Sequence, residues 1–508
     1  MRGGKAGGVI KSPPGAGSLA AGSARGCLMK IAALALLCVL ALTRGALADF
    51  HALLFHARTK DLEGVRTLLA RGADPNPPYE GYDGYTPLMF AAGNGDPQMT
   101  RLLLEAGAVT ERRDHNGERA LQWAARQSFL NPFRDNAECA RLLLQAGSPA
   151  DSAADRYGSS PLIDVSRYGS DPEMVRHLLA AGADPDRVDQ SGETALYGAA
   201  GSPRDSESAR LLLEAGADPN VRVSHRDRTP LHRAALHGRP RTIRLLVEAG
   251  ADIEAREAEG ETALFVAAGR GHLEGVDMLM ALGAQPDARA ASGLTPVLAA
   301  ITGRYASGDG DGHADAARRL AGRTADIDRA FAAALWHGMP DVAGLLFERG
   351  ADIDAIDHLG RSAFAAAAVR PDPVWLDRLV GAGADIARHG DEALLETASR
   401  GRDPGVARLI DLGMAVSGTG IGASALAAAA KHGRVSTVRL LMARGARLDA
   451  LPGMERTARD GMEAARAALE AAIARAEASR THIDVSAERA ELARLEAAHA
   501  RIAEMLGL

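Results

Sequence analysis

The sequence is poor in cysteine, lysine and aromatic residues, and each shortage excludes a class of protein. Three Cys in 508 residues cannot build a small fold held together by disulfide bonds. Aromatic residues make up 4%, which argues against a β-sandwich and leaves Leu, Val and Ala to fill the core. Only five of the 59 basic residues are Lys, and the net charge is −6. We therefore expect no general nucleic-acid partner, because binding phosphates requires a strongly positive surface.

Long apolar runs are also missing, with one exception near the start. Residues 31–42 are apolar, follow Met29 and Lys30, and lead to small residues that end at Ala48. This is the pattern of a secretory signal peptide, and it predicts cleavage between Ala48 and Asp49. An uncleaved anchor is the alternative. Residues 1–48 are thus interpreted as an N-terminal extension and a cleavable signal peptide, in which Met29 is the favoured start. We expect a periplasmic or secreted protein with no stable membrane insertion after cleavage.

A repeat of about 33 residues fills most of the remaining chain. The segments that begin at Arg228 and Glu261 align motif for motif at a spacing of 33 residues. A Thr-Pro-Leu unit marks the start of each repeat in its clearest copies. Twelve positions are equivalent to its Thr: His51, Thr86, Arg119, Ser160, Thr194, Thr229, Thr262, Thr295, Arg329, Ser362, Glu392 and Ser424.

Each repeat predicts two short helices. The Thr is a helix N-cap, and the Pro after it occupies the first helical position, where the missing N–H costs nothing. Paired alanines such as Ala91 and Ala92 allow neighbouring helices to approach closely, and glycines such as Gly95 end the first helix. The pattern T-P-L-H-x-A-A-x-x-G followed by L-L-x-x-G-A-D resembles the ankyrin repeat. The resemblance implies an all-α solenoid of stacked helix–turn–helix repeats with short β-hairpin fingers.

Departures from the pattern predict the domain organisation. A loop is inserted between the two helices of the eighth repeat, and the finger after that repeat is nearly absent. The last residues leave the pattern and predict a helical hairpin that either caps the array or dimerises. The expected segments are repeats 1–7 in 49–293, an irregular repeat 8 in 294–328, divergent repeats 9–12 in 329–453, and the C-terminal helices in 454–508.

No set of residues typical of catalysis accompanies the repeats. The sequence has no nucleophile elbow, phosphate-binding loop or H-E-x-x-H motif. The glycines at 418, 420 and 422 predict a loop, and the acidic stretch 309–315 lacks the final Glu of a calcium loop. The lone Cys139 that remains after cleavage is interpreted as packed. We therefore expect no catalytic residues, no cofactor and no metal, and hence not an enzyme.

A binding surface is the remaining source of function. The ankyrin resemblance implies that partners bind the concave face of the first helices and the finger tips. Transferred by position, the concave face holds Phe90, Trp123, Arg126, Arg167, Tyr168, Arg233, His237, Arg270, Trp336, His337, Arg370 and Arg400. Tyr79, Tyr82 and Tyr85 lie on the long first finger. This basic and aromatic set predicts a protein partner with an acidic surface, although cations at helix C-termini can serve the fold alone.

The sequence therefore predicts an exported, non-catalytic scaffold that binds a protein partner. Two alternatives remain open. The chain could be a structural envelope protein that forms a homo-oligomer through 454–508, or a secreted effector that binds a host protein.

Overall fold

The structure, a computed structural model, describes residues 48–76, 84–127, 135–151, 158–168, 171–203, 206–223, 226–303, 311–417, 420–450, 453–478 and 486–508. It divides into two compact units. One contains the residues up to Gly198 together with Glu214–Ala217, and the other contains Ala199–Leu213 and Asp218–Leu508. The sequence-based expectations for residues 1–47, for Tyr79 and Tyr82, and for the inserted loop at 304–310 lie outside the described residues.

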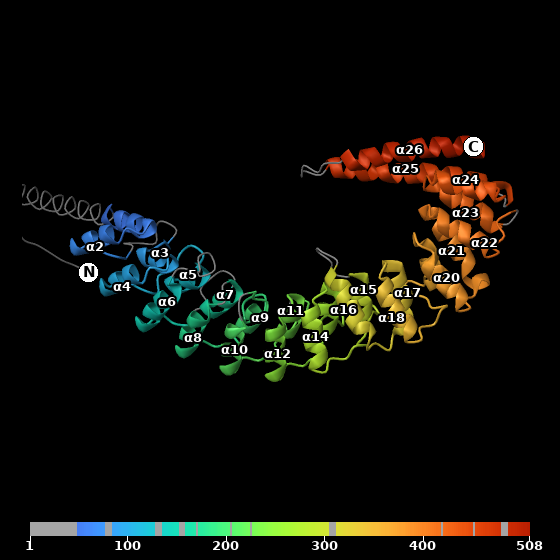
Figure 1. The fold of residues 1–508 in the computed structure, drawn as a ribbon. Helices are drawn as coiled ribbons and strands as arrows, with labels where there is room; N and C mark the ends of the chain where they lie inside the picture. The colour runs from blue at the N-terminus through green and yellow to red at the C-terminus, as the bar shows by residue number, and fades with distance from the viewer. Residues whose placement is uncertain are drawn as a thin grey trace, which may run out of the picture. The chain divides into compact units, whose positions relative to one another are not determined.

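The first unit is a row of short helix pairs (Figure 1). Residues 48–59 are helical, and Phe50, Leu53 and Ala57 of this segment are buried. The helices that follow are α2 Leu62–Ala70, α3 Pro87–Gly93, α4 Pro97–Glu105, α5 Ala120–Gln127, α6 Asn136–Gln145, α7 Pro161–Tyr168 and α8 Pro172–Ala180. Helices α9 Ala195–Ala200 and α10 Glu207–Glu214 lie where the units divide.

The second unit continues the pairs and ends in a long hairpin. Its described helical elements are α11 Pro230–Leu236, α12 Pro240–Glu248, α13 Ala263–Arg270, α14 Leu273–Ala281, α15 Pro296–Thr302, α16 Asp311–Ala321, α17 Ile327–His337, α18 Pro340–Glu348, α19 Ala363–Val369, α20 Val374–Gly381, α21 Ile386–Arg400, α22 Asp403–Asp411, α23 Gly420–Lys431, α24 Val435–Ala443, the 3₁₀ turn η2 Leu448–Ala450, α25 Met454–Ala478 and α26 Ser486–Leu506.

Local residues account for the helix ends. The Thr86 hydroxyl accepts a 3.1 Å hydrogen bond from the amide of Met89, and Pro87 occupies the first position of α3. Helix α13 ends at Gly271, whose φ of 73° is left-handed and suits glycine. The His of the repeat motif is structural. In His232 the imidazole Nδ1 lies 2.8 Å from the Thr229 hydroxyl, and Nε2 lies 3.0 Å from the carbonyl oxygen of Glu261 in the next finger.

The core of each unit lies between two helix layers. Neighbouring first helices pack together, as α11 does against α13, and neighbouring second helices do the same, as α12 does against α14. Every residue of α13 from Ala263 to Gly269 is buried, because small side chains let the flanking helices approach closely. Asn220 adds a link between successive fingers: its side chain donates to the Gly250 carbonyl at 3.0 Å and accepts from the Asp252 amide at 2.8 Å.

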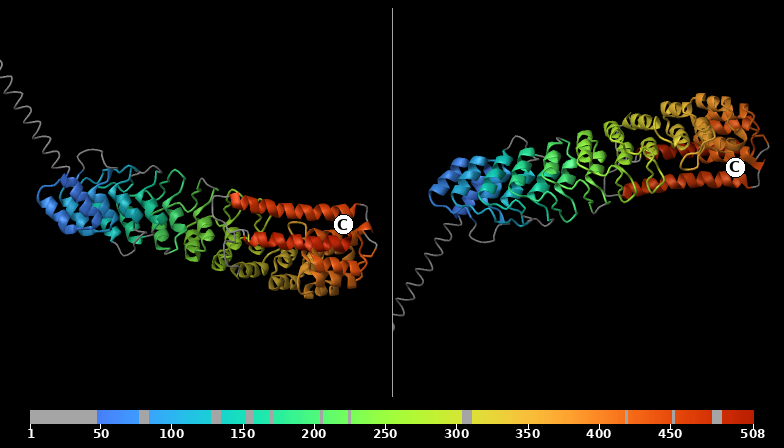
Figure 2. Two further views of the ribbon diagram at one scale, coloured as in Figure 1. Left: turned by 90° about the horizontal axis from the view of Figure 1, so that it is seen from above. Right: turned by 90° about the horizontal axis from the view of Figure 1, so that it is seen from below.

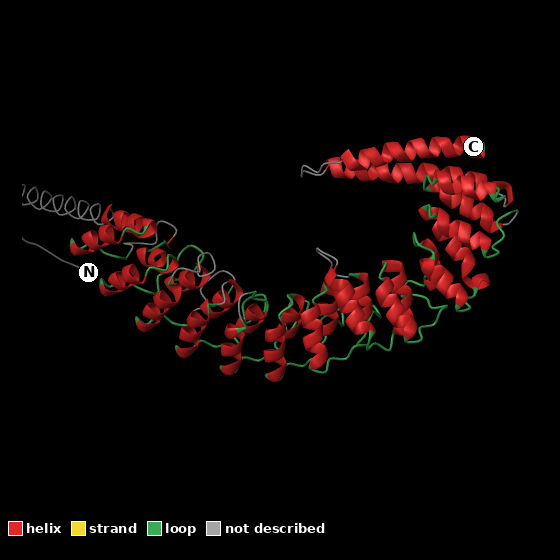
Figure 3. Ribbon diagram, viewed as in Figure 1, coloured by secondary structure: helices red, strands yellow, loops and turns green. Residues whose placement is uncertain are grey.

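The fingers are tighter than the β-hairpins that the resemblance implies. In the part of the chain that the structure describes, no strand forms, and the pairing is limited to two isolated antiparallel bridges, Val223 with Arg228 and Ile356 with Ser362 (Figure 3). Instead, turns close the fingers: the Asp114 amide donates to the Glu118 carbonyl at 2.9 Å, while the Asp114 carboxylate accepts from the Glu118 amide at 2.8 Å. The Asp114 side chain thus supplies a hydrogen bond that a second pair of backbone groups would supply in a longer β-hairpin.

Two helices in the second half differ from the sequence-based expectation. Helix α23 begins at Gly420 and includes Gly422, where a loop was expected. A Cβ on Gly422 would lie 2.1 Å from the Val416 carbonyl oxygen, so this glycine permits close packing rather than an open loop. Helix α21 has 15 residues because its first turns occupy the place of a finger.

The C-terminal helices α25 and α26 lie side by side as a hairpin (Figure 2). Helix α25 packs against α23, and α26 contacts α23 and α24. His499 Nε2 lies 3.0 Å from the carbonyl oxygen of Lys431, the last residue of α23, and Gly433 lies beneath Leu495 and Ala498. The hairpin therefore covers the end of the last helix pair. Among the described helices, none is both long and apolar enough to cross a membrane.

Candidate partner-binding face

Three of the predicted residues form one aromatic cluster in the first unit, termed here the aromatic cluster: Tyr85, Phe90 and Trp123. The ring centroids lie 5.3 Å apart for Phe90 and Trp123, 5.5 Å for Tyr85 and Trp123, and 5.8 Å for Tyr85 and Phe90. Tyr85 comes from the first finger, and the other two come from the successive first helices α3 and α5. All three side chains are half-buried, so the cluster presents part of its surface to solvent.

Polar neighbours fix the orientation of the cluster. The indole Nε1 of Trp123 donates a 3.0 Å hydrogen bond to the Asp114 carboxylate. The exposed ring of His115 lies edge-on to Tyr85, with centroids 5.4 Å apart. Because Asp114 also closes its own finger, the finger and helix α5 hold the indole in one position. Asp114 and His115 were not among the residues predicted from the sequence.

Two predicted arginines of the first unit are bound to carboxylates of the fold. Arg126 Nε lies 3.2 Å from a carboxylate oxygen of the fully buried Asp164, and its guanidinium also pairs with Glu118. Arg167 pairs with Asp189 and, at 2.8 Å, with Glu193. Each arginine thus ties a first helix to acidic residues of its own or the next repeat. These side chains are held in place by the fold, which limits the positive charge that they can offer to a partner.

Trp336 joins three repeats in the second unit. Its indole Nε1 donates to the Ser362 carbonyl at 3.1 Å. The guanidinium carbons of Arg361 and Arg400 lie 4.5 Å and 5.0 Å from the indole centroid, within the range of cation–π attraction. Arg361 also donates to the Asp357 carboxylate at 2.6 Å, and Arg400 to Glu396 at 3.1 Å. Arg361 was not predicted, because only the fold reveals its position over an indole 25 residues earlier in the chain.

Arg233, His237 and Arg270 form a basic group on α11 and α13. The pKa of His237 is lowered to about 4, first by loss of hydration around part of its ring and then by the positive charges of Arg233 and Arg239. The imidazole is therefore neutral at pH 7 among cationic neighbours. His272, which was not among the predicted residues, accompanies the group, and its Nε2 lies 3.1 Å from the Leu236 carbonyl oxygen.

The remaining predicted residues of the concave face are Tyr168, His337 and Arg370. The guanidinium of Arg370 lies against Gly338, and burial lowers the pKa of His337, with Arg361 adding to the effect. Helix α7 ends at Tyr168, whose side chain lies outside the described part, as do Tyr79 and Tyr82. Which of the predicted residues bind a partner stays a prediction.

Chemistry at other positions is limited. Cys139 is buried beside Thr100, and burial raises the pKa of its thiol to about 12, so it is packed rather than nucleophilic. The end of the acidic stretch 309–315 is helical, and His313 Nε2 lies 3.2 Å from the Gly269 carbonyl oxygen. Among the described residues, no group of three His, Cys, Asp or Glu could hold a metal ion.

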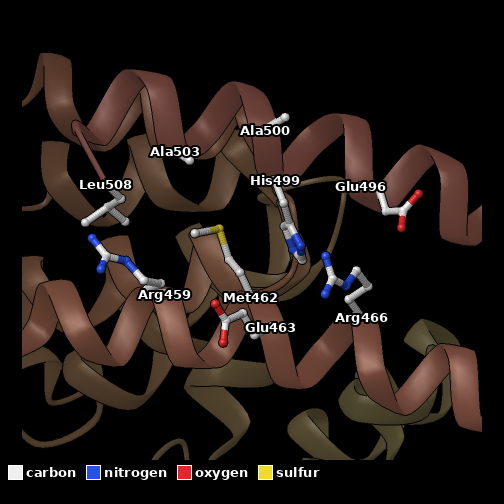
Figure 4. Close-up of a pocket in the computed structure, with 9 residues that line it drawn as sticks. All are labelled: Arg459, Met462, Glu463, Arg466, Glu496, His499, Ala500, Ala503 and Leu508. Carbon is white, nitrogen blue, oxygen red and sulfur yellow. The ribbon is translucent and has the colours of Figure 1, made fainter.

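The C-terminal hairpin contains a cavity of about 390 Å³. Met462 of α25 and His499 of α26 point into the space between the helices, and Arg459 and Arg466 flank it (Figure 4). His499 already contacts the carbonyl of Lys431, and Arg466 pairs with Glu470. The cavity therefore has the features of a helix–helix contact and lacks those of a reaction centre.

Comparisons with known proteins agree with this architecture. A family model described as ankyrin repeats matches residues 53–152, 132–223, 162–257 and 221–290. The chain is 36% identical over 121 residues to ankyrin repeat domain-containing protein 63 of Homo sapiens, which covers 22% of this chain and 30% of that protein. It is 32% identical over 103 residues to a putative ankyrin repeat-containing protein of Treponema pallidum. The match covers 20% of this chain and 32% of that protein.

A plant enzyme matches a limited part of the chain. The chain is 32% identical over 149 residues to the E3 ubiquitin-protein ligase KEG of Arabidopsis thaliana, covering 27% of this chain and 9% of the ligase. The chain thus spans under a third of the length of each of these relatives. The solved ankyrin repeat domain of Bcl-3 is 27% identical, with coverage of 43% of this chain and 95% of that chain and a TM-score of 0.36. The sequence motif, the stacked helix pairs and the family match together show that residues 53–290 are ankyrin repeats, within an all-α ankyrin solenoid.

Proposed function

We propose that this chain is a non-catalytic scaffold that binds a partner protein at the aromatic cluster. Ankyrin repeats generally mediate protein–protein interaction. The predicted arginines Arg126 and Arg167 are paired with carboxylates of the fold, whereas the aromatic cluster keeps part of its surface exposed. Tyr85, Phe90 and Trp123 form a half-exposed surface on one finger and two helices, and this observation carries the proposal. Large aromatic side chains that remain partly exposed on a rigid support are typical of interface hot spots.

The competing explanation is that the rings only pack the finger against the helices. Phe90→Ala separates the two explanations, because it removes one ring and leaves the hydrogen bond between Trp123 and Asp114 in place. The matched control is Phe347→Ala, which removes a half-buried ring from the cluster of Phe331, Phe347 and Trp375 on other helices.

Both variants and the wild type would be used as bait in extracts of the producing cells, with bound proteins quantified by mass spectrometry. We expect one protein to be enriched by the wild type and by Phe347→Ala, and to decrease about tenfold or more with Phe90→Ala. Thermal melting of each bait reports loss of fold. Equal recovery by folded Phe90→Ala and wild type would refute the assignment of this face.

We propose further that the scaffold is exported, with Asp49 as its mature N-terminus. The basic start, the apolar run and the small residues before Ala48 support this proposal. Ala48 and Asp49 are exposed, whereas Phe50 is buried, so cleavage there would keep the packed part of the first helix. N-terminal sequencing of protein purified from the envelope fraction tests it. A mature protein that retains residues 29–48 would exclude cleavage at this site.

A further inference from the structure

Several second helices share one charge pattern. In α6, α8 and α10 an acidic residue precedes an arginine by three positions: Glu138 and Arg141, Glu173 and Arg176, and Glu207 and Arg210. The structure forms an ion pair in all three cases. Helix α16 repeats the arrangement with Asp315 and Arg318, whose N–O distance is 2.9 Å. Residues three apart lie on the same side of a helix, so each of these four helices pairs its arginine with an acidic residue of its own.

Helix α12 differs from these four helices. The acidic position holds Arg241, and Arg244 follows it three residues later. Both side chains are exposed, and neither forms an ion pair or a side-chain hydrogen bond with any residue that the structure describes. Two like charges at this spacing repel each other, so the substitution does not stabilise the helix. The fold offers no reason for a second arginine at this position.

The two arginines line a groove on the layer of second helices. A cavity of about 390 Å³ lies between α10, α12 and α14, with Pro240, Leu245 and Met278 as its apolar surface. Arg210 lines its side on α10. A neighbouring hollow of about 280 Å³ shares Ser206, Pro240 and Arg241 with it, so the depression continues past the start of α12.

Positive charge exceeds negative charge in this groove. Its one lining carboxylate, Glu207, is bound to Arg210 through a 2.8 Å hydrogen bond. Glu274 lines the neighbouring hollow, and among the described residues it forms no ion pair with Arg241. Asp277 on the same helix is paired with Arg319, whose Nε lies 2.9 Å from its carboxylate. Arg239, which precedes α12, has a buried Nε with no hydrogen-bond partner in the described part.

We infer that the groove between α10, α12 and α14 is a second binding surface, which takes an acidic protein segment whose carboxylates pair with Arg241 and Arg244. Apolar side chains of the same segment pack on Pro240, Leu245 and Met278. The charges favour this occupant, because a local excess of arginine on a chain with a net charge of −6 attracts anions. The mixed apolar and cationic lining fits an amphipathic peptide better than a nucleic-acid backbone, which needs a row of phosphate contacts. This surface is independent of the aromatic cluster.

Arg241→Glu is the decisive variant, because it introduces the acidic residue that α6, α8 and α10 carry at this position. The introduced carboxylate can pair with Arg244, as Glu207 pairs with Arg210, so the fold is expected to be retained. Arg439→Glu is the matched control: Arg439 is an exposed arginine on the second helix α24, at the position equivalent to Arg244, and the change in charge is the same.

The probe is a short fluorescein-labelled peptide of glutamate and leucine, measured by fluorescence anisotropy with the full chain. We expect Arg241→Glu to weaken its binding about tenfold and Arg439→Glu to change it less than about twofold. Binding should also weaken as salt is raised. A wild-type chain that does not bind the peptide, or an Arg241→Glu variant that binds it as well as the wild type, overturns the inference.

Two further probes test the chemistry. A version of the peptide with phosphoserine in place of two glutamates reports whether the arginines prefer phosphate, and tighter binding that depends on Arg241 would keep the groove and identify its acidic ligand as phosphorylated. Single-stranded DNA is the third probe. DNA binding that exceeds peptide binding and is lost in Arg241→Glu would refute a protein ligand. Because Phe90→Ala leaves this groove intact, failure of one proposal does not decide the other.

Discussion

The guanidinium Nε of Arg126 lies 3.2 Å from a carboxylate oxygen of Asp164, a residue of the next repeat that is fully buried. Ser159 donates a second hydrogen bond to the same carboxylate at 2.8 Å. Arg126 was expected on a face offered to a partner. In the structure it pairs with a buried acid, and its role in binding a partner stays a prediction.

Arg126→Met is therefore expected to destabilise the first unit. Removing one partner of a buried pair typically costs about 3–5 kcal/mol, and we expect about 2 kcal/mol here because Arg126 keeps 27% of its side chain exposed. Urea denaturation followed by circular dichroism measures the effect. Arg66→Met is the control, since Arg66 pairs with Glu63 on the surface at 3.4 Å and should cost under about 1 kcal/mol. Equal midpoints for the two variants would contradict a structural role for Arg126.

The buried His232 predicts a loss of stability in mild acid. Burial lowers its pKa from 6.5 in the folded chain, so the unfolded chain takes up a proton first as the pH falls below about 6.5. The unfolded state then binds more protons, and the free energy of unfolding decreases by up to about 1.4 kcal/mol per pH unit until the folded pKa is reached. Above pH 6.5 both states are neutral and the effect is absent.

His232→Gln should flatten this part of the pH dependence, because glutamine does not titrate. His115→Gln, at an exposed ring, is the control. Urea midpoints measured between about pH 4.5 and 8 at intervals of about half a unit compare the variants. Half-buried histidines whose pKa is also lowered, such as His272, contribute the remaining part of the slope. If His232→Gln and the wild type show the same slope, the buried imidazole is not its source.

The docking of α26 depends on Gly433. A Cβ on this residue would lie 3.1 Å from Leu495 Cδ1 and 3.2 Å from Ala498 Cβ, and its φ is +64°. Gly433→Ala should therefore loosen the C-terminal hairpin as well as strain the backbone. Gly293→Ala is the control, since Gly293 has a φ of +75° and nothing within 4 Å of an added Cβ. Gly293→Ala should lower the free energy of unfolding only by the strain of a left-handed backbone, about 1–2 kcal/mol.

Hydrogen exchange of the α26 amides measures the loosening. We expect faster exchange in Gly433→Ala than in Gly293→Ala. Sedimentation of the same variants also tests the alternative that residues 454–508 hold copies of the chain together. A wild-type chain that is monomeric at all concentrations would reject oligomerisation through the hairpin, whereas an oligomer that dissociates in Gly433→Ala would support it.

Local patterns predicted the helix pairs, because the signals that form them are short in range. Thr86 and Pro87 begin α3, and Gly271 ends α13, through contacts within a few residues. The structural role of His232 followed from the same motif. The prediction of a loop was wrong at Gly420. A sequence rich in glycine usually indicates a loop, but here Gly422 lies in a helix, because close packing leaves no room for a side chain.

The candidate sites could be predicted only in part. Equivalent repeat positions identified Phe90 and Trp123, and the long first finger identified Tyr85, but only the fold shows that the three rings meet. Asp114 and His115 were missed because nothing in a single finger indicates which side chain turns toward the next helix. The unusual Arg241 could have been found from the sequence by comparing the second helices with one another.

By itself, the sequence determined the repeat, the pairs of helices and the ankyrin architecture, because capping, helix-ending glycines and buried alanines act over a few residues and recur at a period near 33. Tertiary structure alone decided which charges remain available to a partner. Arg126 and Asp164 are 38 residues apart and form a buried pair, whereas Arg241 and Arg244 are three residues apart and have no acidic partner among the described residues. The reason is that the energy with which a charged side chain attracts a partner depends on the charges near it and on its exposure to water. The stacking of successive repeats sets both.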